Sequence, residues 1–573
     1  MRASNRTIAI AAVFITAAVT AFKFFFAIQL PLHPDEAYYW DWSRHLDWSY
    51  YDQGPGVAFY IRIFTSVLGN TIPALKLAAL SAGLIAHILL FFAARRAGVS
   101  AASSLLFVCC TILVPGFFSG SFLIMHDSVL ILFWCAAFLF MLRWIETDSS
   151  ADLFALFACM ALGFLGKHTM VFFGLSFVIW FVLTPASWRE LRNMRLYAAI
   201  GFAAILSSPF IIWNMQNNWD GLGAILNLRS SGGAFANKSS TGAFVVGQAL
   251  LLSPVWFALF LGFAFWILFL QLRNKEIPRS LRSAMEMFHT DRSPEAAKNR
   301  FIWIIALILP VFFLALSRRR EVQPNWTFAS YAGIMLIFFV YRLEQKKWTR
   351  VILAAGAVVA LAMNTFFLFS APLTKALGIP QNPRTARILP HLRLAGSKEV
   401  IEAVDRQRQK IDPSAGILAN RYQDAALAGF YLPGQPQVVS MNVMQRNQYS
   451  YWPGPEPGKN YLVFMVQDNT CEKATFFFQP VLYYMFEKIE EYPESEIVLD
   501  GVAVKRYQTW YVQNYKRDWK GLLLYYMVDA AILDFMPNMR GYNPGLNSAE
   551  GMASIQNYMN QNYFMRKGDV SCD

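Results

Sequence analysis

Long apolar segments recur along the first two thirds of the chain and constrain its fold more than any other feature. The first, from about Ile8 to Leu30, can cross a bilayer, because the hydrocarbon core needs roughly 20 apolar residues in a helix. About eleven such segments are found, at residues 8–30, 71–94, 101–118, 128–145, 151–166, 168–184, 196–213, 244–270, 300–317, 326–341 and 350–370. They predict a polytopic α-helical membrane domain over residues 1–370.

Composition agrees with this interpretation and argues against a nucleic-acid-binding protein. The chain of 573 residues is 56% hydrophobic and only 15% charged, whereas soluble domains carry about 25% charged residues. The net charge of +13 comes mainly from Lys and Arg in short loops between apolar segments, which is a signal of membrane topology. The first apolar segment lacks a clear small-x-small cleavage site before His33, so we interpret it as a retained signal anchor.

The basic loops predict how the chain crosses the membrane. If the N-terminus is cytoplasmic, the loops that alternate with it hold most of the basic residues, including Arg95–Arg96, Arg143, Arg189, the loop 271–300 and Arg350. The positive-inside rule therefore favours a cytoplasmic N-terminus and an external tail. The first external loop, 31–70, then lies outside together with the loops near 119–127, 213–243 and 318–325.

From about Ala371 the composition becomes that of a soluble domain. The expected domain covers residues 371–573. Residues 380–573 are rich in Pro, Gly, Asn, Gln and Tyr and contain short β-like runs such as Tyr461–Val466. A segment of this length can form its own core, and we expect a mixed α/β extracytoplasmic domain. Cys471 and Cys572 lie in it, and a disulfide between them is permitted outside the cytoplasm but not established by the sequence.

A pair of carboxylates, Asp35 and Glu36, stands in a dense cluster of Tyr and Trp directly after the first apolar segment. Pro34 followed by acids also suits the first turn of a helix. The functional interpretation is that one carboxylate is a general base or a metal ligand for a hydroxyl acceptor. Adjacent residues diverge by about 100° on a helix, so we choose Asp35 as the acid that faces a pocket, with Glu36 as the second candidate.

The run HPDEAYYWDWSRHLDWSYYDQGPGVAFYIRIFT resembles the first external loop of GT-C glycosyltransferases related to protein O-mannosyltransferases and lipid A aminoarabinose transferases. The resemblance continues in order through FLIMHD (122–127), GFLGKHT (163–169), SPFIIWN (208–214), QALLLSP (248–254), VQPNW (322–326), RYQ (421–423) and QYSYW (448–452). It implies the GT-C fold and transfer of a sugar from a polyprenyl-phosphate donor, with Asp35 as the catalytic carboxylate.

One departure from the family concerns Tyr51 and Gln53. Relatives commonly carry a basic residue or His before a Pro-Pro pair where this chain has Tyr51-Asp52-Gln53-Gly54-Pro55-Gly56. Gln53 can hydrogen-bond a donor phosphate but cannot neutralise it. The Gly-Pro-Gly run also fits a plain turn.

Asp127, Lys167 and His168 are further substrate-binding candidates. Asp127 begins an apolar run, where it could be a helix N-cap, and the resemblance makes it a second active-site acid. Lys167 and His168 interrupt an apolar stretch, and an ionisable group at that depth is costly unless it is paired or faces water. Lys167 could snorkel to the interface, or it could contact the donor phosphate or the acids.

Arg318, Arg319 and Arg320 are an exception to the charge pattern, because the predicted topology places them outside. Either a helix is miscounted, or the three form a site for the donor phosphate, whose charge guanidinium groups would stabilise. Asn325 and Trp326 nearby offer an amide and a stacking face for a sugar, although Trp is also common at membrane interfaces.

These features predict an inverting glycosyltransferase of GT-C fold that moves a sugar from a polyprenyl-phosphate donor to an envelope acceptor hydroxyl on lipid A or lipopolysaccharide, another glycan or protein Ser/Thr. The competing class is a transporter or flippase of lipid-linked sugars, which often shows internal repeats that are not evident here. No spacing indicates a metal, although a divalent cation between Asp35, Asp127 and phosphate is compatible with these residue types. The expected location is a bacterial inner membrane, with the tail periplasmic and membrane lipids as neighbours.

Overall fold

The computed structural model describes residues 4–226, 240–272, 293–382, 385, 389–441, 447–468, 482 and 485–516. Two compact units are found. The first contains residues up to Ile28, Leu46–Gly223 and the residues from 240 to Leu368 that are described. The second combines Gln29–His45 and Ala224–Leu226 with the described residues from Phe369 onward. The segment that carries Asp35 is therefore grouped with the tail.

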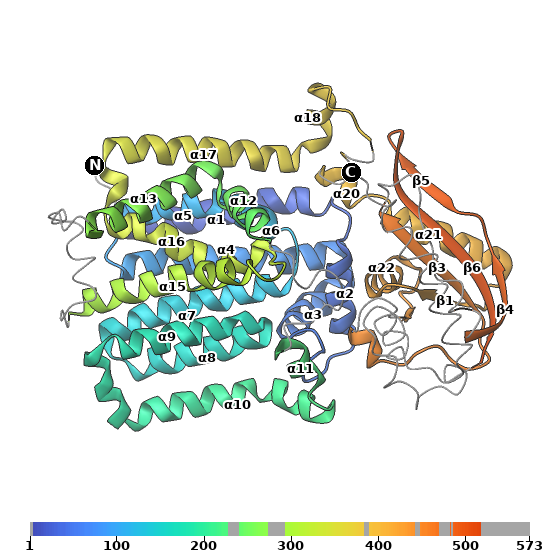
Figure 1. The fold of residues 1–573 in the computed structure, drawn as a ribbon, viewed down its shortest axis with the longest axis horizontal. Coiled ribbons are helices and arrows are strands. Elements are labelled where there is room, and N and C mark those ends of the chain that lie inside the picture. The colour runs from blue at the N-terminus through green and yellow to red at the C-terminus, as the bar shows by residue number, and fades with distance from the viewer. Residues whose placement is uncertain are drawn as a thin grey trace. The chain divides into compact units, whose positions relative to one another are not determined.

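The first unit is a bundle of helices, most of which run roughly side by side (Figure 1). Its longer helices are α1 (Asn5–Ala27), α3 (Gly56–Leu68), α4 (Ile72–Arg96), α5 (Ala101–Leu113), α7 (His126–Thr147), α8 (Ser150–Gly166), α9 (Val171–Val182), α10 (Met194–Gln216), α12 (Thr241–Leu252), α13 (Pro254–Leu272), α15 (Pro294–Leu316), α16 (Phe328–Val340) and α17 (Lys347–Leu368). Short α-helices are α6 (Pro115–Gly120) and α11 (Asp220–Leu226), and 3-10 turns are η1 (His168–Met170), η2 (Pro185–Arg192), η4 (Pro324–Thr327) and η5 (Leu343–Gln345).

Each predicted apolar segment coincides with one of these helices or with two consecutive ones. By length and composition six described helices can cross a membrane, or up to eight if two bent pairs are each one span. One pair bends by 109° between α12 and α13, where buried Ser253 has a φ of 85° and donates to the Gly356 carbonyl at 3.3 Å. The predicted count of about eleven spans stays a prediction.

Helix starts follow local rules. Thr71 and Ser293 each precede a helix, and their side chains accept the backbone N–H three residues on. Pro follows within the first two positions of both helices, where it takes no hydrogen bond from the helix. These signals explain why α4 and α15 begin where they do.

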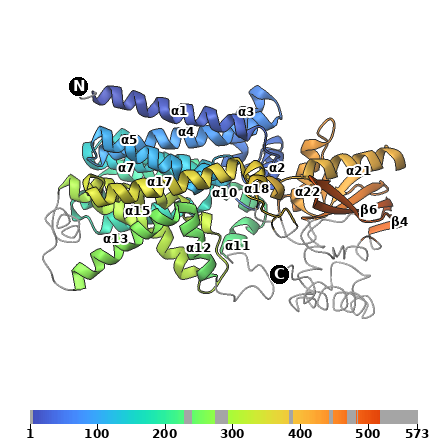
Figure 2. The ribbon, with the colours of Figure 1, turned by 90° about the horizontal axis from the view of Figure 1, so that it is seen from above.

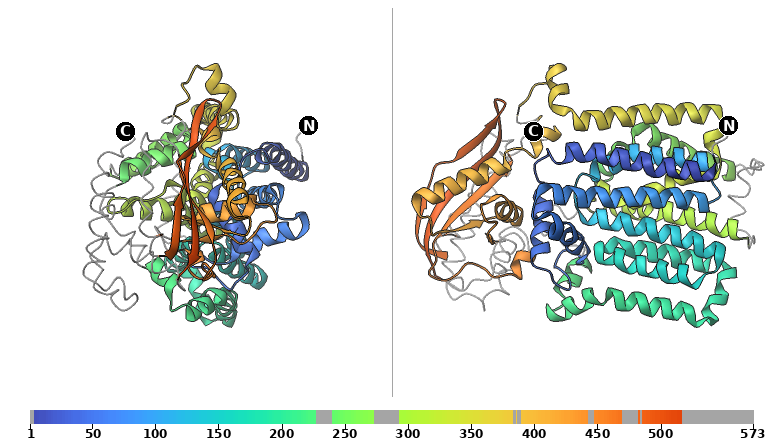
Figure 3. Two further views of the ribbon diagram at one scale, coloured as in Figure 1. Left: turned by 90° about the vertical axis from the view of Figure 1, so that its right-hand side faces the viewer. Right: turned by 180° about the vertical axis from the view of Figure 1, so that it is seen from behind.

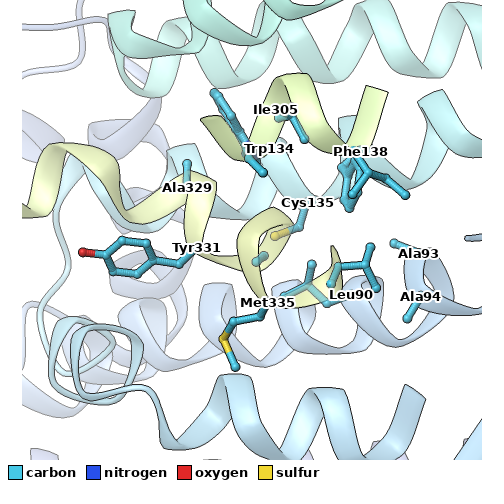
Figure 4. Packing of buried hydrophobic residues seen from close by; sticks show 14 of the residues in the cluster. Leu90, Ala93, Ala94, Trp134, Cys135, Phe138, Ile305, Ala329, Tyr331 and Met335 are labelled. Atoms are coloured by element: carbon cyan, nitrogen blue, oxygen red, sulfur yellow. The ribbon is translucent and has the colours of Figure 1, made fainter. Parts of the chain in front are cut away.

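The core of the bundle surrounds α7 (Figure 4). Trp134, Cys135 and Phe138 of α7 pack with side chains from three neighbouring helices. Those neighbours include Leu90, Ala93 and Ala94 of α4, Ile305 of α15, and Ala329, Tyr331 and Met335 of α16. Small residues such as these three alanines let helices approach closely, which is how membrane helices gain packing energy.

The basic loops gather at one end of the bundle. Glu146, at the end of α7, pairs with Arg96 and with Lys298, both at 3.2 Å. Asp148, two residues after Glu146, forms an ion pair with Arg189 at 2.8 Å. Loops that the positive-inside rule assigns to one side therefore meet in space. This supports the predicted sidedness, while the orientation of the termini stays a prediction.

The second unit is built on a six-stranded mixed sheet (Figure 2). Its strands are β1 (Gly416–Ala419), β2 (Val439–Ser440), β3 (Tyr461–Asp468), β4 (Phe486–Glu491), β5 (Ser495–Leu499) and β6 (Val502–Tyr515). The order is β2-β1-β3-β6-β4, with β5 also on β6. The β1–β2 and β1–β3 pairs are parallel, and the pairs made by β6 are antiparallel.

Helices accompany this sheet. They are α2 (Pro34–Arg44), α18 (Ser370–Ala376), α20 (Pro390–Arg393), α21 (Ser397–Ile411) and α22 (Tyr422–Tyr431), with the 3-10 turn η6 (Gln448–Ser450). Helix α21 runs along the sheet (Figure 3). Consecutive residues Leu462, Val463 and Phe464 of β3 are all buried, so both faces of this strand are covered. The mixed α/β character predicted for the tail is confirmed. Cys471 and Cys572 lie outside the described residues.

Candidate active site

Asp35 lies in the first turn of α2, with its side chain 29% exposed. Its Oδ1 accepts a hydrogen bond from the Gln423 side-chain amide at 3.1 Å. Its backbone N–H donates to His33 Nδ1 at 3.1 Å, so this ring nitrogen acts as a hydrogen-bond acceptor. The carboxylate is thus held from one side by a neutral donor while it keeps access to solvent.

Glu36 has a different environment. It is fully buried, and its Oε2 accepts the His33 backbone N–H at 3.0 Å, which completes a capping box at the start of α2. A helix-start role was one interpretation of this acid pair, and for Glu36 the geometry supports it. Of the two acids, Asp35 is the better placed to meet a substrate.

Asp41, two turns further along α2, is a buried acid that the sequence did not single out. Tyr449 donates to its Oδ2 at 2.6 Å, and Arg44 lies 3.4 Å from its Oδ1. Burial raises the pKa of Asp41, against the opposing effects of Tyr449, Arg44 and His45. This cluster ties the end of α2 to the turn η6.

Asp127 and Lys167 form an ion pair in the first unit. Lys167 Nζ lies 2.7 Å from Asp127 Oδ1, and Asn325 Nδ2 lies 3.5 Å from Asp127 Oδ2. The interpretation of Asp127 as an N-cap is wrong, because α7 begins at His126 and its N-cap is Met125. Asp127 instead stands inside the first turn, where the helix dipole favours an acid. The structure thus brings together three of the predicted site residues.

Gln53 contacts His168 in the same unit. Gln53 Oε1 accepts the His168 backbone N–H at 3.1 Å, which leaves the Gln53 amide NH₂ as the group able to meet a phosphate. The turn beside it needs its glycines, because a Cβ on Gly54 would collide with the Leu165 carbonyl and one on Gly56 would lie 2.9 Å from Gly166 Cα. The Gly-Pro-Gly run is therefore a close-packing turn against the end of α8.

His168 is buried between Phe164 and Phe210, with ring centroids at 5.0 and 4.7 Å. Within the described part of the chain neither of its ring nitrogens has a hydrogen-bond partner. Tyr51 is also buried. Trp326 is half-buried and packs on Phe313, with ring centroids 5.3 Å apart. A sugar-stacking role for Trp326 thus stays a prediction.

The turn 318–320 follows the C-terminus of α15, where the helix dipole favours cations. Arg318 and Arg319 are exposed and Arg320 is half-buried. In the described part of the chain neither Arg318 nor Arg319 makes an ion pair. The turn is anchored by Ser240, whose hydroxyl donates to the Arg320 carbonyl at 2.9 Å. Its two exposed guanidinium groups can meet an anion.

Gln248 is a second residue that the sequence did not assign to the site. Its Nε2 donates to the Pro324 carbonyl at 2.9 Å, and its Oε1 accepts from Thr327 at 2.6 Å and from Tyr331 at 2.7 Å. It thereby holds the turn η4, which carries Asn325 and Trp326. Gln248, Gln423 and Tyr449 all lie in motifs that resemble those of the GT-C glycosyltransferases. This resemblance was the sequence signal that could have pointed to them.

No cation site stands out. Among the described residues no three His, Cys, Asp or Glu side chains converge as metal ligands. The candidate residues divide between the two units. Asp35 and Glu36 belong to the second, and the other candidates, from Tyr51 to Trp326, belong to the first.

Known glycosyltransferases are similar to this chain in sequence. A family model described as dolichyl-phosphate-mannose-protein mannosyltransferase matches residues 52–213. The chain is 24% identical over 357 residues to the lipid A galacturonosyltransferase RgtD of Rhizobium johnstonii. That alignment covers 58% of this chain and 66% of RgtD, so the chain spans about two thirds of this relative's length.

Two solved structures have a similar fold. ArnT from Cupriavidus metallidurans bound to undecaprenyl phosphate matches with a TM-score of 0.59 and 16% identity, over 87% of this chain and 97% of that chain. Its apo state matches with a TM-score of 0.58 and 16% identity, over 87% of this chain and 98% of that chain. These structural matches confirm the predicted GT-C fold, and the likeness to the mannosyltransferase family model and to RgtD agrees with the predicted class of glycosyltransferase. The transporter alternative finds no support in these relatives.

Proposed function

We propose that the chain transfers a sugar from a polyprenyl-phosphate donor to an acceptor hydroxyl in the bacterial envelope, with inversion at the anomeric carbon. The hydroxyl oxygen bonds to the anomeric carbon as the bond from that carbon to the phosphate oxygen breaks. The hydroxyl proton passes to the Asp35 carboxylate, and the polyprenyl phosphate leaves with the bonding electrons. The donor class is supported by the ArnT relative, which was solved with undecaprenyl phosphate.

The contrast between Asp35 and Glu36 carries this proposal. Both acids stand in the same helical turn, yet Glu36 is buried in a capping box while Asp35 is partly exposed and anchored by a neutral amide. A general base must reach the proton that it abstracts. Asp35 meets this condition.

Cationic groups of the first unit are proposed to serve the donor phosphate. Lys167 and the exposed Arg318 and Arg319 carry charge that can stabilise the phosphate as its charge rises during bond cleavage. Because Lys167 already pairs with Asp127, we expect the arginines to contribute the larger net positive field. A divalent cation is not required by this scheme.

Lipid A is the first acceptor to test, because the curated relative RgtD is named for it. The proposed location is the bacterial inner membrane, with a cytoplasmic N-terminus and a periplasmic C-terminal unit. Mass spectrometry of lipid A, other glycans and envelope proteins from cells with and without the gene would reveal the acceptor. A sugar-sized mass difference is expected in one of these fractions, and its absence from all three would contradict the proposal.

The test of the chemistry is Asp35→Asn, which keeps the shape of the side chain and removes its basicity. We expect transfer to fall by about 10² or more, the size of a general-base contribution. The matched control is Glu36→Gln, whose amide oxygen can still accept the His33 N–H, so the fall should be milder. Near-normal transfer by Asp35→Asn would overturn the assignment.

A further inference from the structure

A residue of the C-terminal unit contacts Asp35 directly. Gln423 lies in the first turn of α22, half-buried, and its Nε2 donates to Asp35 Oδ1 at 3.1 Å across 388 residues of sequence. Within the described part of the chain it is the one side chain that hydrogen-bonds this carboxylate. Because a Gln amide nitrogen can only donate, the contact holds the carboxylate oxygen as an acceptor.

The two helices that make this contact are fixed to each other along their length. At the far end of α22 the Tyr431 hydroxyl accepts the Leu32 backbone N–H at 3.0 Å. Trp40 of α2 also packs edge-on against Phe430 of α22, with ring centroids 4.9 Å apart. The hydrogen bond from Gln423 to Asp35 therefore joins two helices that already pack together. Little side-chain freedom of these two residues must be lost to form it.

The chemical type of this partner matters. A Lys or Arg beside Asp35 would favour the charged carboxylate strongly and weaken it as a base. The Gln423 amide orients the carboxylate without placing a charge beside it. With Oδ1 held by Gln423, Oδ2 is left to accept a proton, and His33 Nδ1 lies 3.9 Å from it.

We propose that Gln423 is a positioning residue of the transfer reaction, which holds the Asp35 carboxylate so that Oδ2 faces the acceptor hydroxyl. This inference rests on the proposed function of Asp35. It assigns a direct part in the chemistry to the C-terminal unit, through helix α22.

The test compares Gln423→Ala and Gln423→Glu with Tyr431→Phe in the full-length protein. Misplacing a reacting group by about 1 Å can lower a rate about 10²-fold, so we expect both Gln423 variants to lose about 10-fold to 100-fold in kcat. The donor KM should stay within about 3-fold, because Gln423 acts on Asp35 and not on donor affinity. Gln423→Glu preserves size and folding while it replaces the donor with a second carboxylate.

Tyr431→Phe is the matched control, because it removes the hydrogen bond between α22 and the Leu32 backbone N–H without touching Asp35. Its kcat should stay within about 3-fold of the parent. If Tyr431→Phe loses as much kcat as Gln423→Ala, the contact only docks the helices and the proposal is wrong. Parental kcat in Gln423→Glu would also overturn it.

A double-mutant cycle with Asp35→Asn separates this proposal from the proposed function. If Gln423 acts through Asp35, adding Gln423→Ala to Asp35→Asn should cause no further loss. A second, fully additive loss would refute the positioning role while leaving Asp35 as the base. Full activity of Asp35→Asn alone would refute the proposed function instead.

Discussion

The Lys167 ammonium lies 2.7 Å from the Asp127 carboxylate, and this pair joins the end of α8 to the first turn of α7. The side chains are 10% and 21% exposed, respectively. A lysine at this depth in an apolar segment costs a few kcal/mol unless it is paired. The pair therefore explains how Lys167 is tolerated between two apolar helices.

The first prediction concerns this pair. Lys167→Met should lower stability by about 2–4 kcal/mol, because it leaves the Asp127 carboxylate partly buried without its cation. Asp127→Asn should cost a similar amount, and the double variant should cost less than the sum. Thermal unfolding in detergent measures the coupling, expected at about 1–3 kcal/mol. Simple additivity of the two single variants would contradict a direct interaction.

The second prediction concerns the arginine turn, where Arg318 and Arg319 are exposed and Arg320 is half-buried. Alanine variants of the three should be unequal. At least one should lose about 2–4 kcal/mol of transition-state stabilisation if it meets the developing phosphate charge, and the others about 1 kcal/mol if they only attract lipid headgroups. The measurement is kcat/KM for the donor. Three variants with parental kcat/KM would place the phosphate site elsewhere, with Lys167 the next candidate.

The third prediction tests whether Gln248 supports the turn that carries Asn325. Gln248→Leu removes three hydrogen bonds, each worth about 0.6–1 kcal/mol between membrane helices, so a stability loss of about 2 kcal/mol is expected. Transfer should fall as well, because Asn325 would be less well placed beside Asp127. The control is Thr327→Val, which removes one partner of Gln248 and should have a smaller effect. An equal loss in both variants would argue against a central role for Gln248.

The fourth prediction is a pH dependence of stability from Asp412. Hydrogen bonds from Ser414, Tyr511 and Asn460 hold the pKa of this carboxyl well below its usual range. A lowered folded-state pKa means that the stabilisation is present above the unfolded-state pKa of about 4 and is lost as the pH falls toward the folded-state value. Asp412→Asn should therefore lower Tm at neutral pH and have less effect near pH 3. A pH-independent difference in Tm would rule out this linkage.

The fifth prediction is the sidedness of the chain, which can be tested with single cysteines in a cysteine-free background. Suitable exposed positions are Leu46 and Ser414, predicted external, and Trp348, predicted cytoplasmic. An impermeant thiol reagent should label the first two in cells whose inner membrane is intact. Trp348→Cys should react only after that membrane is permeabilised, and its labelling beforehand would reverse the topology.

The sequence by itself determined the elements whose signals are local. Apolar length marked most helices of the bundle, because hydrophobicity over about 20 residues is a property of one continuous segment. Helices α3 and α11 lie outside the predicted apolar segments. Pro34 and the acids after it marked the start of α2, because helix-start preferences depend on a few adjacent residues. The β-like run at Tyr461–Val466 likewise fell within β3.

The tertiary structure alone decided which side chains meet. Asp127 and Lys167 are separated by 40 residues, and Asp35 and Gln423 by 388. Nothing in the periodicity of either partner reveals the other. The local pattern also gave Asp127 a capping role that the helix boundary contradicts. It could not show that Gln53 accepts a hydrogen bond from the His168 backbone N–H. Such contacts depend on which helices pack together and on the rotamer each side chain adopts there, and these are set by the whole fold.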